Sequence, residues 1–172
     1  MDLHDFDTTT LYFEDALAPE AEALIQKASD EYGEEGAELH LLKAYFIAPA
    51  HLTVLVALYR YYFYQHRLED ALLIADRAMS EAAERMHIPD DWRKLDANWI
   101  GHAAMNGMGL LRFYLMSLKA AAIVEMRLGE LTQAIERLEK LTELDTADRL
   151  GIAPLLDLAK DRQSMLNDNV AA

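Results

Sequence analysis

Glu84 and His87 have the clearest spacing for metal chemistry in this sequence. Residues three positions apart lie on one face of a helix, as metal ligands do in di-iron helical bundles. Such bundles use two Glu-x-x-His motifs and two further carboxylates, whereas this chain contains a single motif. The sequence therefore favours a histidine without a metal at this position, and it predicts no metal site and no cofactor.

Other kinds of catalytic site are missing from the sequence. The chain has no cysteine, which excludes disulfides, thiolate zinc sites, iron–sulfur clusters and cysteine nucleophiles. It contains no His-Glu-x-x-His motif, phosphate loop, Gly-x-Ser-x-Gly elbow or dinucleotide fingerprint. We expect that the protein is not an enzyme. A helical metal-binding protein or enzyme that uses Glu84 and His87 remains an alternative.

The charge of the chain excludes two classes of partner. The formal net charge is −14, and residues 1–38 contain twelve Asp or Glu but one basic residue, Lys27. An acidic surface disfavours binding to nucleic acid and to anionic membranes. The N-terminus lacks the basic and apolar stretches of a signal peptide. We therefore expect a cytoplasmic protein.

The elements that must position the side chains are helices. Only four Pro and seven Gly interrupt the 172 residues, and apolar residues recur at helical spacing. Asp90 or Asp91 is placed to cap a short helix through Trp92 and Leu95. We expect longer helices at 19–31, 35–48, 51–65, 68–87, 108–128, 131–144 and 147–166.

Small residues recur at a fixed interval. The interval from Ala37 to Ala71 equals the interval from Ala44 to Ala78. Between residues 52 and 85, one expected helix carries large apolar residues and the next carries alanines, which lets the two helices approach closely. The residues of this pattern are Leu55, Leu58, Tyr59, Tyr62, Ala71, Ala75 and Ala78.

This pattern resembles the tetratricopeptide repeat (TPR) family, whose period of about 34 residues matches the interval between the alanines. A weaker copy at 18–51 contains Pro49 where the family places a helix-ending proline, and a third copy spans 115–148. Tyr59 stands where the family usually has glycine. The resemblance implies an all-α, TPR-like helical-hairpin solenoid of about three repeats, in which the last helix covers the end of the stack.

A long insert interrupts the repeats. The interval from Ala71 to Ala134 exceeds one period by most of a second, and the extra residues fall at 86–114. We therefore divide the chain into three parts. These are an acidic, loose N-terminal segment at 1–17, a TPR-like domain with its insert at 18–148, and a capping helix with a tail at 149–172.

The resemblance implies an adaptor or scaffold that binds another protein or peptide. In the family, the first helices of successive hairpins line a groove that holds an extended peptide or a helix. The expected groove mixes aromatic, Met and basic side chains, which suit an interface. The chain's own acidic N-terminal segment could also cover these cations. The residues carried over are Val56, Arg60, Phe63, Tyr64, Met116, Lys119, Ile123, Met126 and Arg127.

The insert supplies a second candidate binding surface. Trp92 and Trp99 lie within it, and Arg93 and Arg112 add positive charge. Long insertions between regular units often carry function. The two tryptophans could instead fill the gap that the insert creates.

Two further resemblances give alternatives. As a small acidic chain with three such repeats, the sequence is similar to cytoplasmic chaperones of type III secretion translocators, which implies a cytoplasmic chaperone of a secreted or assembling client. Segments 58–64, 89–93, 112–115 and 144–149 resemble those of small repeat proteins encoded beside bacterial nitrogen-fixation genes. A homodimer that buries the groove on a second copy is a further possibility.

Overall fold

The structure is a computed structural model that describes residues 15–34 and 36–171, with side chains up to residue 168. The described part is all-α and contains no strand, and none of its helices combines the length and the apolar character that a membrane span needs. The helices are α1 (Pro19–Asp30), α2 (Gly36–Ile47), α3 (Leu52–Tyr64), α4 (Leu68–Met86), the 3-10 helix η2 (Trp92–Lys94), α5 (Ala97–Asn106), α6 (Met108–Leu128), α7 (Leu131–Leu144) and α8 (Ala153–Ala171).

Local sequence signals set the helix ends. Pro19 opens α1, where its fixed φ fits the helix and its missing N–H is not needed. At the start of α3, the Thr53 N–H donates to His51 Nδ1 at 3.3 Å. Helix α6 ends at Gly129, whose φ of +86° suits glycine. The six helices expected between residues 19 and 144 are confirmed, each to within one residue at both ends.

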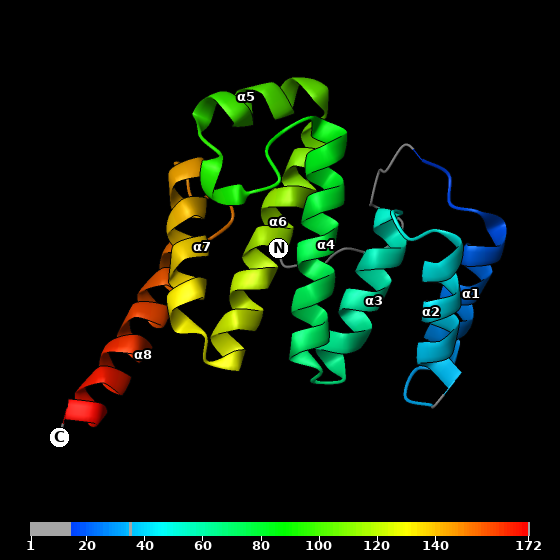
Figure 1. The fold of residues 1–172 in the computed structure, drawn as a ribbon, viewed down its shortest axis with the longest axis horizontal. Helices are drawn as coiled ribbons and strands as arrows, with labels where there is room; N and C mark the ends of the chain where they lie inside the picture. Colours follow the sequence, from blue (N-terminus) through cyan, green and yellow to red (C-terminus); the bar gives the residue numbers. More distant parts are fainter. Residues whose placement is uncertain (1–14, 35, 172) are drawn as a thin grey trace.

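The helices stand in a row rather than closing on one another (Figure 1). Helices α1 and α2 form one antiparallel pair at one end of the row, followed by the pair α3 and α4 and then by α6 and α7. Helix α8 packs against α7 at the other end. Helix α5 lies across the upper ends of α4, α6 and α7 in Figure 1, and it contacts α6. The arrangement is a stack of helical hairpins with one interruption.

Alanines at the repeat positions are buried between the helices. The repeat positions Ala37, Ala44, Ala71 and Ala78 are each at most 4% exposed. A methyl side chain lets two helices approach more closely than a Leu or Phe would, and the well-packed interior leaves no room for a larger group. The large repeat residues Leu55, Leu58, Tyr59 and Tyr62 are also buried, as the spacing predicts.

Helix α8 begins later than expected, at Ala153 rather than near Ala147. The Leu150 N–H donates to Asp145 Oδ2 at 2.8 Å, and Gly151 has a φ of +63°, so this stretch forms a turn rather than a helix. The earlier start was wrong because it placed Pro154 in a helix interior, where proline lacks the required N–H. In the structure Pro154 lies in the first turn. The helix also extends to Ala171, through most of the expected tail.

The insert contains a helix that the sequence analysis misses. The short helix expected through Trp92 is confirmed as η2, and Asp91 caps it by accepting from the Arg93 N–H. Helix α5 was not predicted. Its N-cap is Asp96, whose side chain accepts from the Asn98 and Trp99 N–H groups at 2.9 and 3.0 Å. The aspartate was the sequence signal for this helix start.

Of the segment 1–17, which was expected to be loose or to dock through Leu11, Tyr12, Phe13 and Leu17, the structure describes residues 15–17. Asp15 Oδ2 accepts a hydrogen bond from Arg85 Nη1 at 2.8 Å, and the Asp15 carbonyl lies 3.0 Å from His51 Nε2. Leu17 packs against the hydrophobic core. These contacts tie the start of α1 to α3 and α4. Residues 1–14, including Leu11, Tyr12 and Phe13, lie outside the described residues.

We predict that Ala82→Leu destabilises the protein by about 1–3 kcal/mol, because Ala82 is fully buried on α4, the helix that packs against both α3 and α6. Urea denaturation followed by circular dichroism measures the change. The matched control is Leu73→Ala on the same helix, where the side chain is 68% exposed and the expected change is about 0.5 kcal/mol or less. Equal effects of the two substitutions would contradict the close packing.

Candidate functional site

A groove of about 580 Å³ lies between α1 and α3. Both helices are the first members of their hairpins, and Leu41 of α2 contributes from behind. We call this surface the α1–α3 groove. Its lining residues are Ile25, Ala28, Ser29, Tyr32, Leu41, Val56, Ala57, Arg60, Tyr61 and Tyr64.

Side-chain size accounts for the groove. Ala28, Ser29 and Ala57 line it but are too small to fill the space between the two helices. Helices α1 and α3 also touch each other sparsely, because each packs mainly against its own hairpin partner. Tyr32 and Tyr64 stand at the rim and are 51% and 46% exposed. The result is an apolar floor bordered by accessible aromatic rings.

The polar groups of the groove are hydroxyls and one guanidinium. Tyr32 and Tyr61 meet edge to face at a centroid distance of 6.3 Å. Burial raises the pKa of the Tyr61 hydroxyl, and the neighbouring Glu38 carboxylate raises it further. The hydroxyl therefore stays protonated at neutral pH and can donate a hydrogen bond. Arg60 supplies the positive charge of the groove lining.

Glu38 is neutralised beside the groove. Arg67 Nη1 donates to Glu38 Oε1 at 2.6 Å, and the Tyr62 hydroxyl donates to the same oxygen at 3.2 Å. Burial, followed by the proximity of Glu38, raises the pKa of Tyr62 to about 12, so this donor also persists at neutral pH. The contacts join α2, α3 and the start of α4, and they pair the carboxylate that raises the pKa of Tyr61.

The α3 residues that were predicted to line the binding groove do not all line the α1–α3 groove. Val56, Arg60 and Tyr64 are among the residues that line the α1–α3 groove. Phe63 does not, because it is 8% exposed and stacks on Tyr59 at 5.8 Å. The guanidinium of Arg127 lies 4.7 Å from the centre of the Phe63 ring. Phe63 therefore belongs to the contact between α3 and the end of α6.

Most α6 residues that were predicted to line the binding groove are buried or bonded to other parts of the protein. Met116 and Met126 are 1% and 7% exposed, so they are not surface groove residues. Lys119 Nζ donates to the Leu150 carbonyl at 2.7 Å, and Arg162 Nη1 of α8 donates to the Met126 carbonyl at 3.3 Å. The loop before α8 and α8 itself thus hold this side of α6. Ile123 is partly exposed, and Arg127 Nη2 lies 3.1 Å from His66 Nδ1.

Helix α1 supplies groove residues that the predicted set leaves out. Ile25, Ala28 and Ser29 of α1 line the groove together with Tyr32 of the turn that follows α1, and Tyr61 adds a ring from α3. The helical spacing of Ile25, Ser29 and Tyr32 was the available signal. This signal was weak, because the segment 1–38 is strongly acidic and the apolar face within it is short.

The two tryptophans of the insert do not form one surface. Trp92 is 8% exposed, and the guanidinium of Arg93 lies 4.1 Å from the centre of its ring. Trp99 is 37% exposed on α5, where it meets His102 edge to face. Arg112 is exposed on α6. A shallower depression of about 380 Å³ is lined by Trp92, Arg93, Glu136, Glu139, Lys140 and Glu143.

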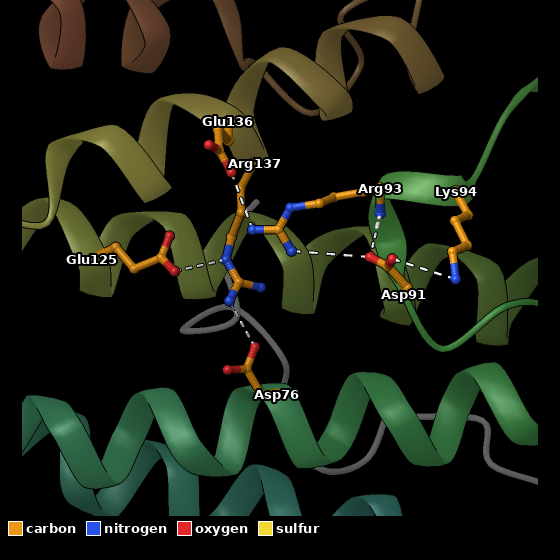
Figure 2. Close-up of polar contacts among 7 residues, drawn as sticks. All are labelled: Asp76, Asp91, Arg93, Lys94, Glu125, Glu136 and Arg137. Atoms are coloured by element: carbon orange, nitrogen blue, oxygen red, sulfur yellow. Dashed lines mark hydrogen bonds and ion pairs between the residues drawn. The ribbon is translucent and has the colours of Figure 1, made fainter.

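A buried arginine joins the insert to the stack (Figure 2). Arg137 of α7 donates from Nε to Glu125 of α6 at 2.8 Å, and its Nη2 pairs with Asp76 of α4 at 2.9 Å. Its guanidinium also lies 5.4 Å from the centre of the Trp92 ring. Arg93 Nη2 pairs with Glu136, the neighbour of Arg137 on α7, at 3.1 Å. Three helices and η2 therefore meet at one side chain.

Among residues 15–34 and 36–171, no three His, Asp or Glu side chains come together as a metal site would require. Glu84 and His87 are both exposed. His87 ends α4 with a φ of +55°, so its backbone closes the helix. The described part of the chain therefore gives the Glu-x-x-His motif no further ligands.

Comparison with known proteins identifies a relative. The chain is 46% identical, over 164 residues, to the "uncharacterized 19.8 kDa protein in nifW 5′ region" of Azotobacter chroococcum mcd 1. The alignment covers 95% of this chain and 92% of that protein. The chain belongs to the family of that protein. The relative's name places it beside a nif gene, in agreement with the resemblance drawn from segments 58–64 and 89–93.

The other two comparisons add no member to this family. No family model matches the chain, and no solved structure matches it either. The assignment to the family therefore rests on the bacterial relative.

We predict that Arg137→Met destabilises the fold by about 3–5 kcal/mol, because it leaves the Glu125 carboxylate buried without its partner. Urea denaturation measures the change. Arg93→Ala, which removes an exposed ion pair nearby, should cost about 1 kcal/mol or less. The double substitution Arg137→Met with Glu125→Met should recover most of the loss. A double variant as unstable as Arg137→Met would contradict this account.

The pH dependence of stability tests the Glu125 environment. Burial raises the pKa of the Glu125 carboxyl above its ordinary value of 4.5, although Arg137 acts in the opposite direction. The folded state thus favours the protonated carboxyl, and its contribution to stability is lost as pH rises through the raised pKa. The stability of Glu125→Gln relative to the unchanged protein should therefore improve between pH 4.5 and neutral pH. A difference that stays constant across this range would contradict the raised pKa.

Proposed function

We propose that this protein is an adaptor of the TPR type, which binds a short segment of another protein in the α1–α3 groove. Support for the TPR assignment comes from the regular spacing of buried alanines and from the order in which the hairpins pack. In a stack of this type, the first helices of successive hairpins form the binding side. The groove lies between two such helices.

The observation that carries the proposal is the composition of the groove. An apolar floor that includes Val56 and Leu41 is bordered by accessible tyrosines and by Arg60. Tyr and Arg are the residues most often found at the energetic centre of protein interfaces. A tyrosine supplies a large contact area at low entropic cost, and its hydroxyl pairs with a polar group of the partner. These features fit a peptide better than they fit a reacting small molecule.

The ligand is expected to be short. On the α6 side, Lys119 and Met126 are engaged by the loop before α8 and by α8 itself. A groove of about 580 Å³ accommodates one or two anchoring side chains rather than a folded domain. We therefore propose an extended segment or a single helical turn as the bound element. The proteins encoded beside the relative, in the nifW region, are the first candidates as its source.

Photo-crosslinking tests the proposal. The crosslinking residue p-benzoylphenylalanine replaces Tyr32 or Tyr64 at the rim in one set of variants, and Phe46 or Leu73 in a control set. Phe46 and Leu73 are 88% and 68% exposed but do not line the groove. We expect rim positions, and not control positions, to form a specific adduct with another protein in the native cells.

A groove-filling substitution separates specific from incidental adducts. Ser29→Trp places an indole in the groove from an exposed position on α1, so the fold should tolerate it. The rim adduct should disappear in this background, and a melting curve checks that the variant is folded. Adducts from the control positions alone, or rim adducts that persist in Ser29→Trp, would refute the groove as the binding site.

A further inference from the structure

The charged groups at the α1–α3 groove are already engaged within the protein. Arg60 lines the groove, and it takes part in an interaction inside the protein. The carboxylate that acts on Tyr61 belongs to Glu38, which accepts hydrogen bonds from Arg67 at 2.6 Å and from Tyr62 at 3.2 Å. None of the described lining residues is Asp, Glu or Lys. A charged group of a ligand would therefore lose its water in the groove without meeting an opposite charge that lacks a partner, which is unfavourable.

The floor of the groove is hydrocarbon. Ala28 of α1 and Ala57 of α3 contribute only methyl groups, so the space between the two helices stays open beside them. Leu41 and Val56 border the same space and are at most 4% exposed. An apolar side chain that is buried against such a surface stabilises a complex in proportion to the area removed from water. The groove therefore favours an apolar group from the ligand.

Tyrosine rings decide which apolar group fits best. Tyr32 and Tyr61 meet edge to face, with ring centroids 6.3 Å apart and an angle of 83° between the ring planes. Tyr32 is about half exposed, so the pair has accessible ring surface. A third aromatic ring gains more there than an aliphatic side chain, because aromatic contacts contribute beyond the area that they bury. The hydroxyls of Ser29 and Tyr32 can each donate and accept, which suits the backbone on either side of that ring.

We infer that the α1–α3 groove takes one uncharged aromatic side chain from an extended segment of another protein, with the ring between Ala28 and Ala57 and against the Tyr32–Tyr61 pair. This inference rests on the proposed function and adds the chemical class of the anchor. A groove of about 580 Å³ holds one such ring together with the backbone that carries it. The match is one of charge as well as shape. A chain with a net charge of −14 repels acidic segments, whereas an uncharged anchor binds without a counter-charge.

Selection from a phage-displayed library of random dodecapeptides, with the full chain as bait, tests the anchor. The unchanged protein should enrich peptides that share a Trp, Tyr or Phe, with no charge required beside it. In a synthetic peptide of this kind, replacing the aromatic residue by Ala should weaken binding about tenfold or more, as for an interface hot spot. Replacing it by Leu should weaken binding about two- to tenfold, which is the amount that aromatic contacts add to area alone.

Two measurements separate this anchor from a charged one. Raising the NaCl concentration from about 0.05 to about 0.5 M should alter the affinity less than about twofold, because the ligand forms no ion pair. Tyr32→Leu should reduce the preference for an aromatic residue over Leu, while peptides with Leu bind as before. Tyr32 lies in the turn after α1 and is 51% exposed, so the fold should tolerate this change.

A matched pair of substitutions on α1 separates the failure of the inference from the failure of the proposed function. Ser29→Trp fills the groove, whereas Ala23→Trp places the same side chain at an exposed position of α1 that does not line it. Ala57→Trp fills the groove from α3 if Ser29→Trp does not fold. Binding that is lost only when the groove is filled, but that requires a charged anchor or accepts Leu equally well, would overturn the inference and leave the groove as a binding site. Binding that survives in a folded, groove-filled variant would overturn both.

The chain's own sequence supplies the competing occupant. Leu11, Tyr12 and Phe13 form an uncharged aromatic stretch that lies outside the described residues. Enrichment by the double variant Tyr12→Ala with Phe13→Ala, but not by the unchanged protein, would assign the groove to this stretch and overturn the partner. A lack of enrichment by either protein would overturn the inference and the proposed function together.

Discussion

The close approach of helices through alanine is the constraint on which the rest of the structure depends. Ala44, Ala71 and Ala78 are at most 4% exposed, and they lie on helices that pack both within and between hairpins. Each hairpin can therefore lie directly against the next, and the helices form a row rather than a closed bundle (Figure 1). An open row leaves the first helices of neighbouring hairpins side by side. Ala28 and Ser29 of α1 and Ala57 of α3 line the space between these two helices. Their side chains are too small to fill it, so a groove remains.

The insert is accommodated by a different kind of interaction. Arg137 pairs with Glu125 and Asp76 and lies near the Trp92 ring, so α4, α6 and α7 meet η2 through one guanidinium (Figure 2). A buried ion pair contributes little net stability, but it penalises any arrangement that separates its members. The ion pairs of Arg137 therefore fix how the insert packs against the helical hairpins. Helix α5 is held mainly by α6 and lies outside this cluster.

The sequence predicts the helices well because their signals are local. Pro19 and Gly129 mark ends that depend on backbone conformation alone. The site is harder to predict, because burial depends on residues distant in the chain. Met116 was expected to face a ligand, and nothing in α6 indicates that Leu150 and α8 lie on the same side. The late start of α8, at Ala153, could have been predicted from Pro154, which suits the first turn of a helix.

The central claim is that a partner segment contacts α1 and α3, and not α6 or the insert. Amide hydrogen exchange of the full chain, alone and with the partner recovered by crosslinking, tests it most directly. We expect slower exchange within residues 25–32 and 56–64, with no change in α5 or α7. Slower exchange confined to α5, η2 and α7 would place the partner on the insert and contradict the claim.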